Sequence, residues 1–390
     1  MPDPCAWGPE RQQFIDEITC YTDVLAANGY TCGLSGKWHL GDSITPRHGM
    51  SHWFCMPWGA CEYNDAEMIR DGKTQVCEGY LTDVITDDAL AFIDANKSGP
   101  FYLSVHYNAP HSPWTGHPQD IVDSYDDCPF KSCPQEAAHP WFIRSPSWRA
   151  HMGNRESLKG YFAAVTAMDA GVGRIIKRLE KLGLRENTLV VFSSDNGFSC
   201  GHHGFWGKGN GTFPLNMYDN SVKVPTIFSH PGRIPAGKVT AAMVSQYDFL
   251  PTLLEYLDLP GMDDPILPGV SFAPVLYGQT DQADEQVVVF SEYGPVRMIR
   301  TPEHKYVHRY PYGPHELYDL QSDSDERNNL IDEKSAQPTV AEMRRRLSDW
   351  FARYVMTRLD GARMPVTGYG QAARIDGNFC GEGAFAPLEG

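Results

Sequence analysis

One stretch of the chain gathers residue types that bind hard cations and stabilise negative charge. The apolar run Leu189–Phe192 is followed by Asp195 and Asn196, and a glycine-rich segment beyond them contains Lys208. An unbroken apolar run predicts a strand buried on both faces. Polar groups at the carboxyl end of such a strand lie in the crevice where an open α/β sheet meets solvent. Asp195 and Asn196 offer oxygen atoms, which calcium and magnesium prefer, so we identify them as candidate metal ligands.

Two other predicted strands end in residues that can carry positive charge. Residues 30–34 run into Lys37 and His39, and residues 101–105 run into His111. The alternative for all three segments is an ordinary polar turn, in which side chains hydrogen-bond the backbone. We favour a site for the Lys37 segment because Gly-Lys-Trp-His-Leu-Gly is a specific context. His111 lies between prolines and also suits a rigid loop.

The adjacent histidines His202 and His203 suggest a transition-metal site, because imidazole is a common zinc ligand. Neighbouring side chains on an extended segment point to opposite sides, so at most one of the two would face a site. We therefore favour an ordinary hydrogen-bonded loop histidine. Four aromatic residues are a weak indication of a sugar or aromatic leaving group, and they suit loop packing equally well: Trp53, Phe54, Trp58 and Trp114.

The elements that must position these residues follow from the hydrophobic pattern. Helical spacing predicts helices over residues 10–29, 80–96, 158–182, 245–257 and 340–355. Short apolar runs predict strands over residues 30–34, 101–105, 189–192 and 224–228, and closely spaced antiparallel strands over 287–291, 296–300, 305–308 and 316–319. Residues 51–76 read as an irregular loop over a site, residues 114–150 as a long surface excursion, and residues 360–390 as a strap or tail.

Composition limits the classes of partner. The formal charge of -16 over 390 residues argues against nucleic acid as a ligand, although a few buried cations can still bind an anionic substrate. No apolar run approaches the roughly 20 residues of a membrane span, and the N-terminus has no signal-peptide pattern. We expect a soluble, cytoplasmic protein with no membrane partner.

The ten cysteines are scattered along the sequence, so most of them should be thiols. For Cys128 and Cys133 a disulfide, a weak metal site and no role remain open, and we favour no role.

Four segments together resemble the sulfatase family of the alkaline-phosphatase superfamily, in the order and spacing of that family. The resemblance extends from roughly residue 20 to residue 355. The segments are Gly33–Gly41 (GLSGKWHLG), Tyr107–Pro113 (YNAPHSP), Ser194–Gly197 (SDNG) with Gly207–Lys208, and Glu316–Leu320 (ELYDL) with Glu326–Leu330 (ERNNL).

The resemblance implies a sulfuric ester hydrolase that uses a formylglycine made from cysteine and a divalent cation, calcium or else magnesium or manganese. It implies that Lys37, His111 and Lys208 hold the sulfate oxygens and that His39 acts on the formylglycine hydroxyls. Asp195 and Asn196 would be two of the metal ligands. This assignment is chemically reasonable, because fixed cationic donors and a hard cation stabilise the charge that develops on a sulfuryl group.

Two parts of the family pattern are missing from this sequence. No cysteine is followed by Pro or Ala two residues later and by Arg five residues later, and the nearest imitation, Ser145–Arg149, has Arg144 at the nucleophile position. The strand that ends in paired metal-binding aspartates is also missing, since the other aspartate pairs lie in a predicted helix or in loops: Asp87-Asp88, Asp126-Asp127 and Asp263-Asp264. We therefore expect a sulfatase without its N-terminal segment, through a misplaced start codon or a real truncation, that is nearly inactive as written.

Together these observations predict an α/β fold, a three-layer α/β/α sandwich around a mixed, largely parallel sheet. Residues 1–285 would form this domain, and residues 286–390 a smaller α+β subdomain of an antiparallel sheet and a helix, because Pro, Gly and Asp crowd residues 260–286. The favoured substrate is a small sulfate ester, a sulfated sugar or an aryl sulfate. The alternatives are a phosphate or phosphonate monoester hydrolase, which an Asn after Asp195 disfavours, and a degenerate anion-binding protein. The sequence does not indicate the oligomeric state.

Overall fold

The computed structural model describes residues 15, 18–142, 146–262, 264–291, 296–355, 360, 362, 378–379 and 382–383. The chain forms two compact units, Met1–Pro134 with Ala150–Thr188, and Gln135–Arg149 with Leu189–Gly390. We refer to these as unit 1 and unit 2 and describe each by itself. The division into domains 1–285 and 286–390 stays a prediction. No helix among the described residues combines the length and the apolar composition that crossing a membrane requires.

Unit 1 contains a mixed five-stranded sheet in the order β4-β3-β2-β1-β5. Its strands are β1 (Thr31–Gly36), β2 (Met50–Cys55), β3 (Asn64–Arg70), β4 (Lys73–Tyr80) and β5 (Phe101–His106). Strand β1 pairs in parallel with β2 and β5, whereas β2–β3 and β3–β4 are antiparallel. The predicted α/β class with a mixed central sheet is confirmed, and two of its four pairings are parallel.

The prediction of an irregular loop over residues 51–76 is wrong for most of that range, because residues 51–55, 64–70 and 73–76 belong to β2, β3 and β4, and the longest stretch without a strand is 56–63. Two signals in the sequence were overlooked. Ala66 and Met68 alternate with exposed residues and pack with Phe54 into a buried cluster. Asp71 and Gly72 both have positive φ, 51° and 71°, which is the conformation of a tight two-residue hairpin turn. The alternation in β3 and the Asp-Gly pair after it are therefore the sequence signals of this hairpin, whereas residues 56–63, which include Trp58 and Gly59, form no strand.

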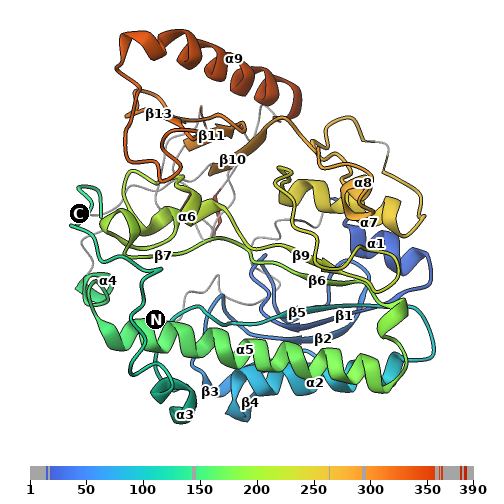
Figure 1. The fold of residues 1–390 in the computed structure, drawn as a ribbon. Coiled ribbons are helices and arrows are strands. Elements are labelled where there is room, and N and C mark those ends of the chain that lie inside the picture. The colour runs from blue at the N-terminus through green and yellow to red at the C-terminus, as the bar shows by residue number, and fades with distance from the viewer. Residues whose placement is uncertain are drawn as a thin grey trace. The chain divides into compact units, whose positions relative to one another are not determined.

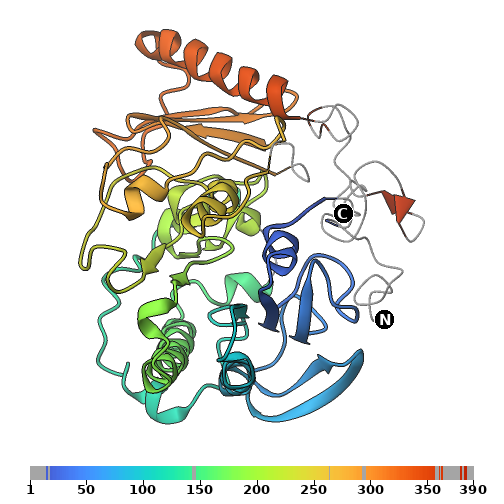
Figure 2. The same cartoon turned by 90° about the vertical axis from the view of Figure 1, so that its right-hand side faces the viewer.

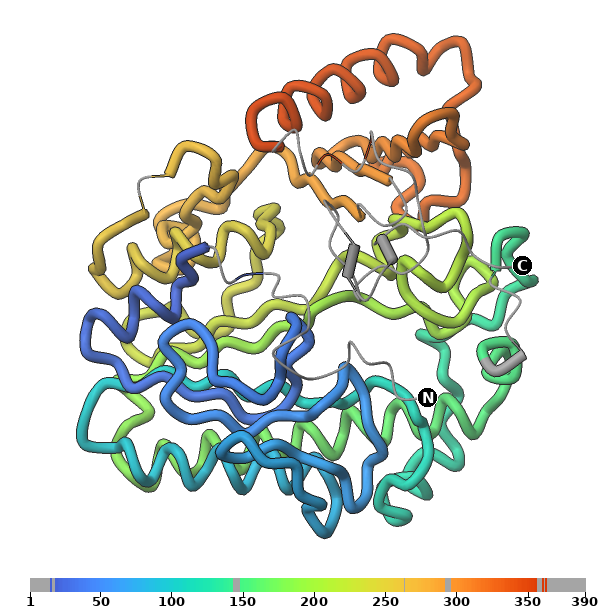
Figure 3. Tube along the Cα trace, turned by 180° about the vertical axis from the view of Figure 1, so that it is seen from behind, coloured from blue at the N-terminus to red at the C-terminus, as the bar shows by residue number. Residues whose placement is uncertain are grey.

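The helices of unit 1 are α1 (Tyr21–Ala27), α2 (Leu81–Asn96), α3 (Gln119–Asp123) and α5 (Arg155–Lys181), with a 3₁₀ turn at Arg185–Asn187. Helices α2 and α5 lie side by side along one face of the sheet (Figures 1 and 3). The close approach of α2 depends on Gly33 in β1, where a Cβ atom would lie 2.6 Å from the ring of Phe92. The predicted helices over residues 80–96 and 158–182 are confirmed.

The predicted helix over residues 10–29 is wrong at its start. Residues 10–14 lie outside the described residues, and the helix begins only at Tyr21. Cys20 is extended, and its backbone N–H donates to the carboxylate of Asp23 at 2.8 Å, which caps the first turn. Gly29 follows the helix with φ +86°, as a residue that ends a helix commonly does.

In unit 2 the apolar run ahead of Asp195 forms β6 (Val190–Phe192), as predicted, but its environment differs from the prediction. Within the described part of the chain, strand β6 pairs only with β9 (Ile227–Ser229), antiparallel, in a two-stranded sheet, and all three residues of β6 are half-buried. The prediction of a strand buried on both faces is therefore wrong. An apolar run indicates a strand, but it does not indicate how many other strands pair with it.

The C-terminal part of unit 2 is an antiparallel sheet covered by a helix, as predicted (Figure 2). The strands are β10 (Val287–Ser291), β11 (Val296–Arg300), β12 (His304–Arg309) and β13 (Glu316–Asp319), and the helix is α9 (Gln337–Tyr354). Val288, Ile299 and Tyr306 of the sheet pack with Leu347 and Phe351 of α9 into one buried core.

The other elements of the described chain are short. They are α4 (Pro146–Arg149), β7 (Ser199–Cys200), η2 (His202–Gly204), β8 (Trp206–Gly207), η3 (Gly209–Gly211), α6 (Asp219–Val222), η4 (Gln246–Asp248), α7 (Phe249–Tyr256), α8 (Ala273–Leu276), η5 (Lys334–Ala336), β14 (Asn378–Phe379) and β15 (Glu382–Gly383). Most of the predicted tail over residues 360–390 lies outside the described residues. Among the described residues of 114–150 the only helices are α3 and α4, which agrees with the predicted excursion.

Candidate active site

Lys37 lies where the carboxyl ends of three parallel strands of unit 1 meet. Gly36, the last residue of β1, is paired with Cys55 of β2 and with His106 of β5. The backbone N–H of Lys37 donates to the carbonyl of His106 at 2.7 Å, and Nδ1 of His106 lies 2.9 Å from the carbonyl oxygen of Lys37. The carbonyl can only accept, so Nδ1 of His106 is the donor in this contact. His106 thus fixes the backbone from which the Lys37 side chain extends.

The reciprocal contact requires glycine at position 36. Gly36 has φ +115°, and a Cβ atom there would lie 2.0 Å from the carbonyl oxygen of His106. A side chain would therefore separate β1 from β5 at the point where Lys37 begins.

His39 lies against the segment that follows β2. A Cβ atom at Gly59 would be 2.3 to 2.6 Å from the Cε1, Nε2 and Nδ1 atoms of the His39 ring. The absence of a side chain at Gly59 therefore makes the space that the imidazole occupies. His39 is half-buried, as Lys37 is.

His111 closes a turn at the end of β5. Its backbone N–H donates to the carbonyl of Asn108 at 2.8 Å, and the hydroxyl of buried Tyr63 donates to the carbonyl of His111 at 2.9 Å. In the ring, Nδ1 lies 3.0 Å from the carbonyl oxygen of Ser112 and 3.3 Å from the hydroxyl of Ser112, so local contacts to the next residue orient the imidazole.

In unit 2 the structure brings together two of the candidate residues that lie twelve positions apart. The ammonium group of Lys208 donates to the amide oxygen Oδ1 of Asn196 at 2.5 Å. Both side chains are half-buried, and Asp195 beside them is exposed. A cationic group and a pair of potential oxygen ligands therefore share one place at the end of β6.

The loop that carries Asp195 and Asn196 is fixed by backbone contacts. The Ser194 hydroxyl donates to the carbonyl of Asn196 at 2.9 Å, and the carbonyl of Ser194 accepts from the side chain of Gln246 at 2.7 Å. Gly197 donates its N–H to the carbonyl of Ser221 at 3.0 Å, and a Cβ atom at Gly197 would lie 2.2 Å from the carbonyl oxygen of Asn220. Glycine is required here because the backbone of α6 lies directly against it.

Several residues that hold these loops were not identified from the sequence, namely His106, Tyr63, Gly59, Gln246, Ser221 and Asn216. One usable signal existed for Asn216. It is a polar residue between the apolar residues Leu215 and Met217, and in the structure it is 1% exposed. A buried amide must find hydrogen-bond partners, so such a position indicates a polar network.

His203 is packed inside unit 2 against an aromatic ring. It is buried, its ring stacks on Tyr218 with 3.8 Å between ring centroids, and burial lowers its pKa to about 4. The expectation of an extended segment here is wrong, because residues 202–204 form a 3₁₀ turn in which His203 has φ +54°. The stack on Tyr218 supports the favoured interpretation of an ordinary loop histidine.

Two aspartates of these pairs are engaged in other contacts, Asp88 and Asp126. Asp88 of α2 is buried and accepts hydrogen bonds from Ser35 at 2.5 Å, His52 at 2.8 Å and Arg70 at 2.6 Å. Asp126 is paired with Lys159 at 2.6 Å. Asp263 lies outside the described residues.

Four cysteines of the described region do not resemble an activated nucleophile, namely Cys20, Cys32, Cys55 and Cys61. All eight that the structure describes have thiol side chains, Cys128 and Cys133 included, which agrees with the predicted scatter of thiols. Burial raises the pKa of Cys55 and of Cys61 to about 12, and it raises the pKa of Cys20 and of Cys32 to about 11, with a smaller contribution from nearby carboxylates. A thiol that resists ionisation is a poor nucleophile.

Three of the four aromatic residues considered for a substrate subsite are core residues. Trp53, Phe54 and Trp114 are buried at 6%, 1% and 5% exposure, so they pack the interior of unit 1. Trp58 is half-buried.

Asp195 and Asn196 fit a hard cation in part. They supply a carboxylate and an amide oxygen, which are suitable ligands for calcium or magnesium, although such cations bind six or more oxygens. The hydrogen bond from Lys208 uses one lone pair of the Asn196 oxygen and leaves the other for a metal.

The model of the sulfatase family matches residues 9–259, which is more than half of the 390 residues. The chain belongs to the sulfatase family. A second family model, that of the C-terminal region of N-sulphoglucosamine sulphohydrolase, matches residues 201–353. The resemblance inferred from the four segments is confirmed.

Among sulfatases, the chain is 27% identical to an N-acetylglucosamine-6-O-sulfatase of Bacteroides thetaiotaomicron, with 82% of this chain and 69% of that protein covered. It is 29% identical to an ulvan-active sulfatase of Formosa agariphila, covering 81% of this chain and 62% of that protein. It is 28% identical to a choline-sulfatase of Rhizobium meliloti, covering 63% of this chain and 51% of that protein. The chain therefore spans less than two thirds of the length of the latter two sulfatases.

A solved structure described as a complex with its substrate D-glucosamine-2-N,6-O-disulfate has the same fold. Its TM-score is 0.76 at 24% identity, and 90% of this chain and 85% of that chain are covered. The sulfatase fold predicted from the sequence is thereby confirmed.

Proposed function

We propose that this chain carries the sulfate-binding and metal-binding parts of a sulfuric ester hydrolase, and that its substrate is a sulfated sugar. The observation that carries the proposal is the sulfatase match over residues 9–259, since it includes the strand ends that hold every candidate residue. The sugar is suggested by a relative that is named for a sulfated N-acetylglucosamine.

The candidate cations have the chemistry that sulfate transfer requires. Lys37 and Lys208 supply ammonium groups and His111 an imidazole, and such donors stabilise negative charge on sulfuryl oxygens when their positions are fixed in advance. The backbone of each of these residues is held by a hydrogen bond. Lys37 is bonded to His106, the carbonyl of His111 to Tyr63, and the carbonyl of Lys208 to the side chain of Asn216. His39, placed against Gly59, would hold or move a proton near the reacting group.

Asp195 and Asn196 would be ligands of a divalent cation, for which calcium is our first choice. When bound, the cation would add positive charge next to the oxygens of the substrate. The loop between β6 and Gly197 would hold the cation, and its Asn196 side chain would keep Lys208 close to it.

Hydrolysis of phosphate or phosphonate esters is the weaker alternative, and the similarity to sulfatases of several specificities does not favour it. An anion-binding protein without turnover is the third possibility. The protein should be expressed, together with any coding sequence that precedes it in the same reading frame, and assayed with matched aryl sulfate and aryl phosphate in the presence of Ca²⁺. Turnover of the sulfate supports the proposal, and a strong preference for the phosphate would overturn it.

A separate measurement tests whether the substrate is a sulfated sugar. N-acetylglucosamine 6-sulfate and unsulfated N-acetylglucosamine should be titrated into the protein with Ca²⁺ by calorimetry. Binding of the sulfated sugar that is lost in Lys208→Met, and kept in the exposed control Lys73→Met, is the expected result. Equal affinity for both sugars would contradict a sulfate pocket.

A further inference from the structure

Asn216 lies in the loop between Lys208 and α6 and is 1% exposed. Its side-chain nitrogen lies 3.1 Å from the carbonyl oxygen of Lys208, 3.2 Å from that of Gly209 and 3.1 Å from the hydroxyl of Thr212. Its side-chain oxygen accepts from the hydroxyl of Ser221 at 2.6 Å. The amide therefore uses both of its polar ends inside the protein, and one end holds the backbone of Lys208.

Ser221 connects this amide to the other loop of the candidate site. Its hydroxyl, 2% exposed with the rest of the residue, donates to Asn216, and its carbonyl accepts from the N–H of Gly197 at 3.0 Å. Gly197 directly follows Asn196. A continuous path of three hydrogen bonds thus joins the backbone of Lys208 to the loop of Asp195 and Asn196, and we call it the Asn216 brace.

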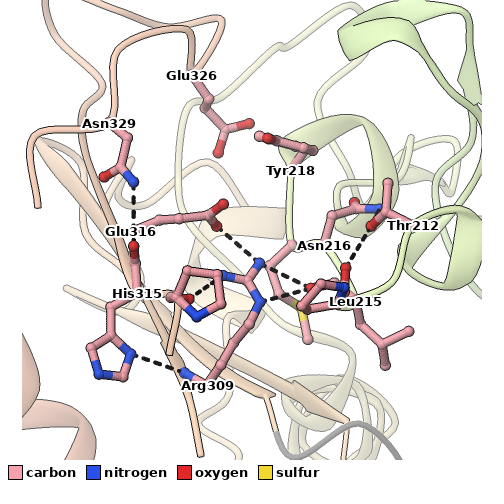
Figure 4. A network of polar contacts seen from close by, with 12 residues as sticks. Thr212, Leu215, Asn216, Tyr218, Arg309, His315, Glu316, Glu326 and Asn329 are labelled. Atoms are coloured by element: carbon pink, nitrogen blue, oxygen red, sulfur yellow. Dashed lines mark hydrogen bonds and ion pairs between the residues drawn. The ribbon is translucent and has the colours of Figure 1, made fainter. Parts of the chain in front are cut away.

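The brace is attached to the C-terminal sheet through the residue before Asn216. Arg309 of β12, 3% exposed, donates to the carbonyl of Leu215 from Nε at 3.0 Å and from Nη2 at 2.9 Å (Figure 4). The same guanidinium donates to Glu316 at 3.1 Å and to the carbonyl of Pro314 at 2.7 Å. A rigid sheet therefore fixes the segment from which Asn216 reaches Lys208.

The hydrogen bond between the ammonium group of Lys208 and the Asn196 oxygen is too weak by itself to hold the two loops at this separation. A lysine side chain has four rotatable bonds and loses considerable conformational entropy when it is fixed. The contact is favoured only if the two backbones are already held at the right separation, and the brace supplies that restraint.

We propose that Asn216 and Ser221 are positioning residues, which keep the ammonium group of Lys208 and the amide of Asn196 together. The proposal rests on the proposed function in assigning these two groups to sulfate and metal binding. The arrangement of the brace itself does not depend on that assignment. A purely structural role would affect stability without a specific link to Lys208.

Two measurements on Ser221→Ala test this, and Ser221→Thr serves as the variant that keeps the hydroxyl. The first is amide hydrogen exchange, followed by mass spectrometry, in peptides covering residues 194–198 and 208–212. We expect Ser221→Ala to lower protection in both peptides at least fivefold and Ser221→Thr, which keeps the hydroxyl, to restore it. Asn210→Ala, an exposed change in the same loop, is the matched control. Unchanged protection in Ser221→Ala would overturn the brace, whether or not the protein binds sulfate.

The second measurement is a double-mutant cycle on the affinity for inorganic sulfate in the presence of Ca²⁺. In the wild-type background Ser221→Ala should weaken sulfate binding about tenfold, the effect of losing one buried hydrogen bond. In the Lys208→Ala background the same change should have almost no effect, because the group that it positions is gone. Equal effects in both backgrounds would show a general structural role and overturn the proposal. Absence of sulfate binding by the wild type would instead count against the proposed function, and hydrogen exchange would then decide the brace.

Discussion

The ammonium group of Lys208 donates to the side-chain oxygen of Asn196 at 2.5 Å, so a positive charge already lies on a candidate metal ligand. A divalent cation at Asp195 and Asn196 would repel it, because like charges a few ångströms apart interact strongly even near a protein surface. Sulfate between them would reduce that repulsion. Metal and anion are therefore expected to bind cooperatively.

Lys208→Met should separate these effects. Removing the ammonium group should strengthen Ca²⁺ binding in the absence of sulfate by roughly tenfold, because the cation no longer competes with a charge on the same oxygen. It should weaken sulfate binding in the presence of Ca²⁺. Calorimetry at low ionic strength measures both, with Lys73→Met as the exposed control. A weaker affinity for Ca²⁺ in Lys208→Met would contradict this prediction.

Gly36→Ala should destabilise the sheet of unit 1 where Lys37 begins. The new Cβ would lie 2.0 Å from the carbonyl oxygen of His106. Gly79→Ala is the matched control, since Gly79 also lies in a strand with positive φ, +100°, but has no atom within 4 Å of a Cβ. Denaturant unfolding should show about 1 kcal/mol lost in the control and about 3 kcal/mol more in Gly36→Ala. Equal losses would mean that backbone conformation alone, and not the contact with His106, requires glycine.

Gly59→Ala should displace His39 with little effect on stability elsewhere. The added methyl group would overlap the imidazole ring at 2.3 to 2.6 Å, and the ring can rotate away. Sulfate ester turnover should fall about a hundredfold, the usual contribution of a proton-transfer group. Gly99→Ala, where a Cβ meets nothing within 4 Å, should retain activity. Full activity in Gly59→Ala would exclude His39 from the reaction.

The stability of the protein should depend on pH through His203. Burial lowers its pKa from 6.5 to about 4, so the folded state binds fewer protons than the unfolded state between these values. The contribution of neutral His203 to the free energy of unfolding is fully present above pH 6.5. It is lost as the pH falls towards 4, and the total loss is roughly 3 kcal/mol.

His203→Phe keeps the stack on Tyr218 and removes the titration. The difference in unfolding free energy between variant and wild type should therefore change in favour of the variant as the pH falls from 6.5 to 4. Other buried histidines such as His117 and His308 are present in both proteins, so their contributions cancel. Parallel curves for the two proteins would show that His203 does not titrate in this range.

The ends of strands could be predicted from the sequence, because chemistry-bearing residues directly follow short apolar runs. Lys37 after β1, His111 after β5 and Asn196 after β6 were found in this way. The number of neighbours of each strand could not be predicted. Val191 looks the same in sequence whether its strand has one partner or two, and it proved half-buried in a two-stranded sheet.

The supporting residues were harder to predict, because their partners are distant in the sequence. Gly59 gives no local sign that the ring of His39 lies against it, and Arg309 gives no sign of its two hydrogen bonds to Leu215. Gly79 and Gly36 are both glycines with positive φ, yet only one of them has a carbonyl oxygen against it. Such differences depend on tertiary packing.

The chain crosses between its two units three times, after residues 134, 149 and 188, and this affects how the protein is made. During synthesis, unit 1 cannot be completed until α5 has left the ribosome, and residues 135–149 must wait for partners that are translated still later. Neither unit corresponds to a single continuous fragment. A cut at any one position therefore leaves one unit incomplete or carries part of the other with it, and limited proteolysis should not release either unit as an intact, independently folded piece.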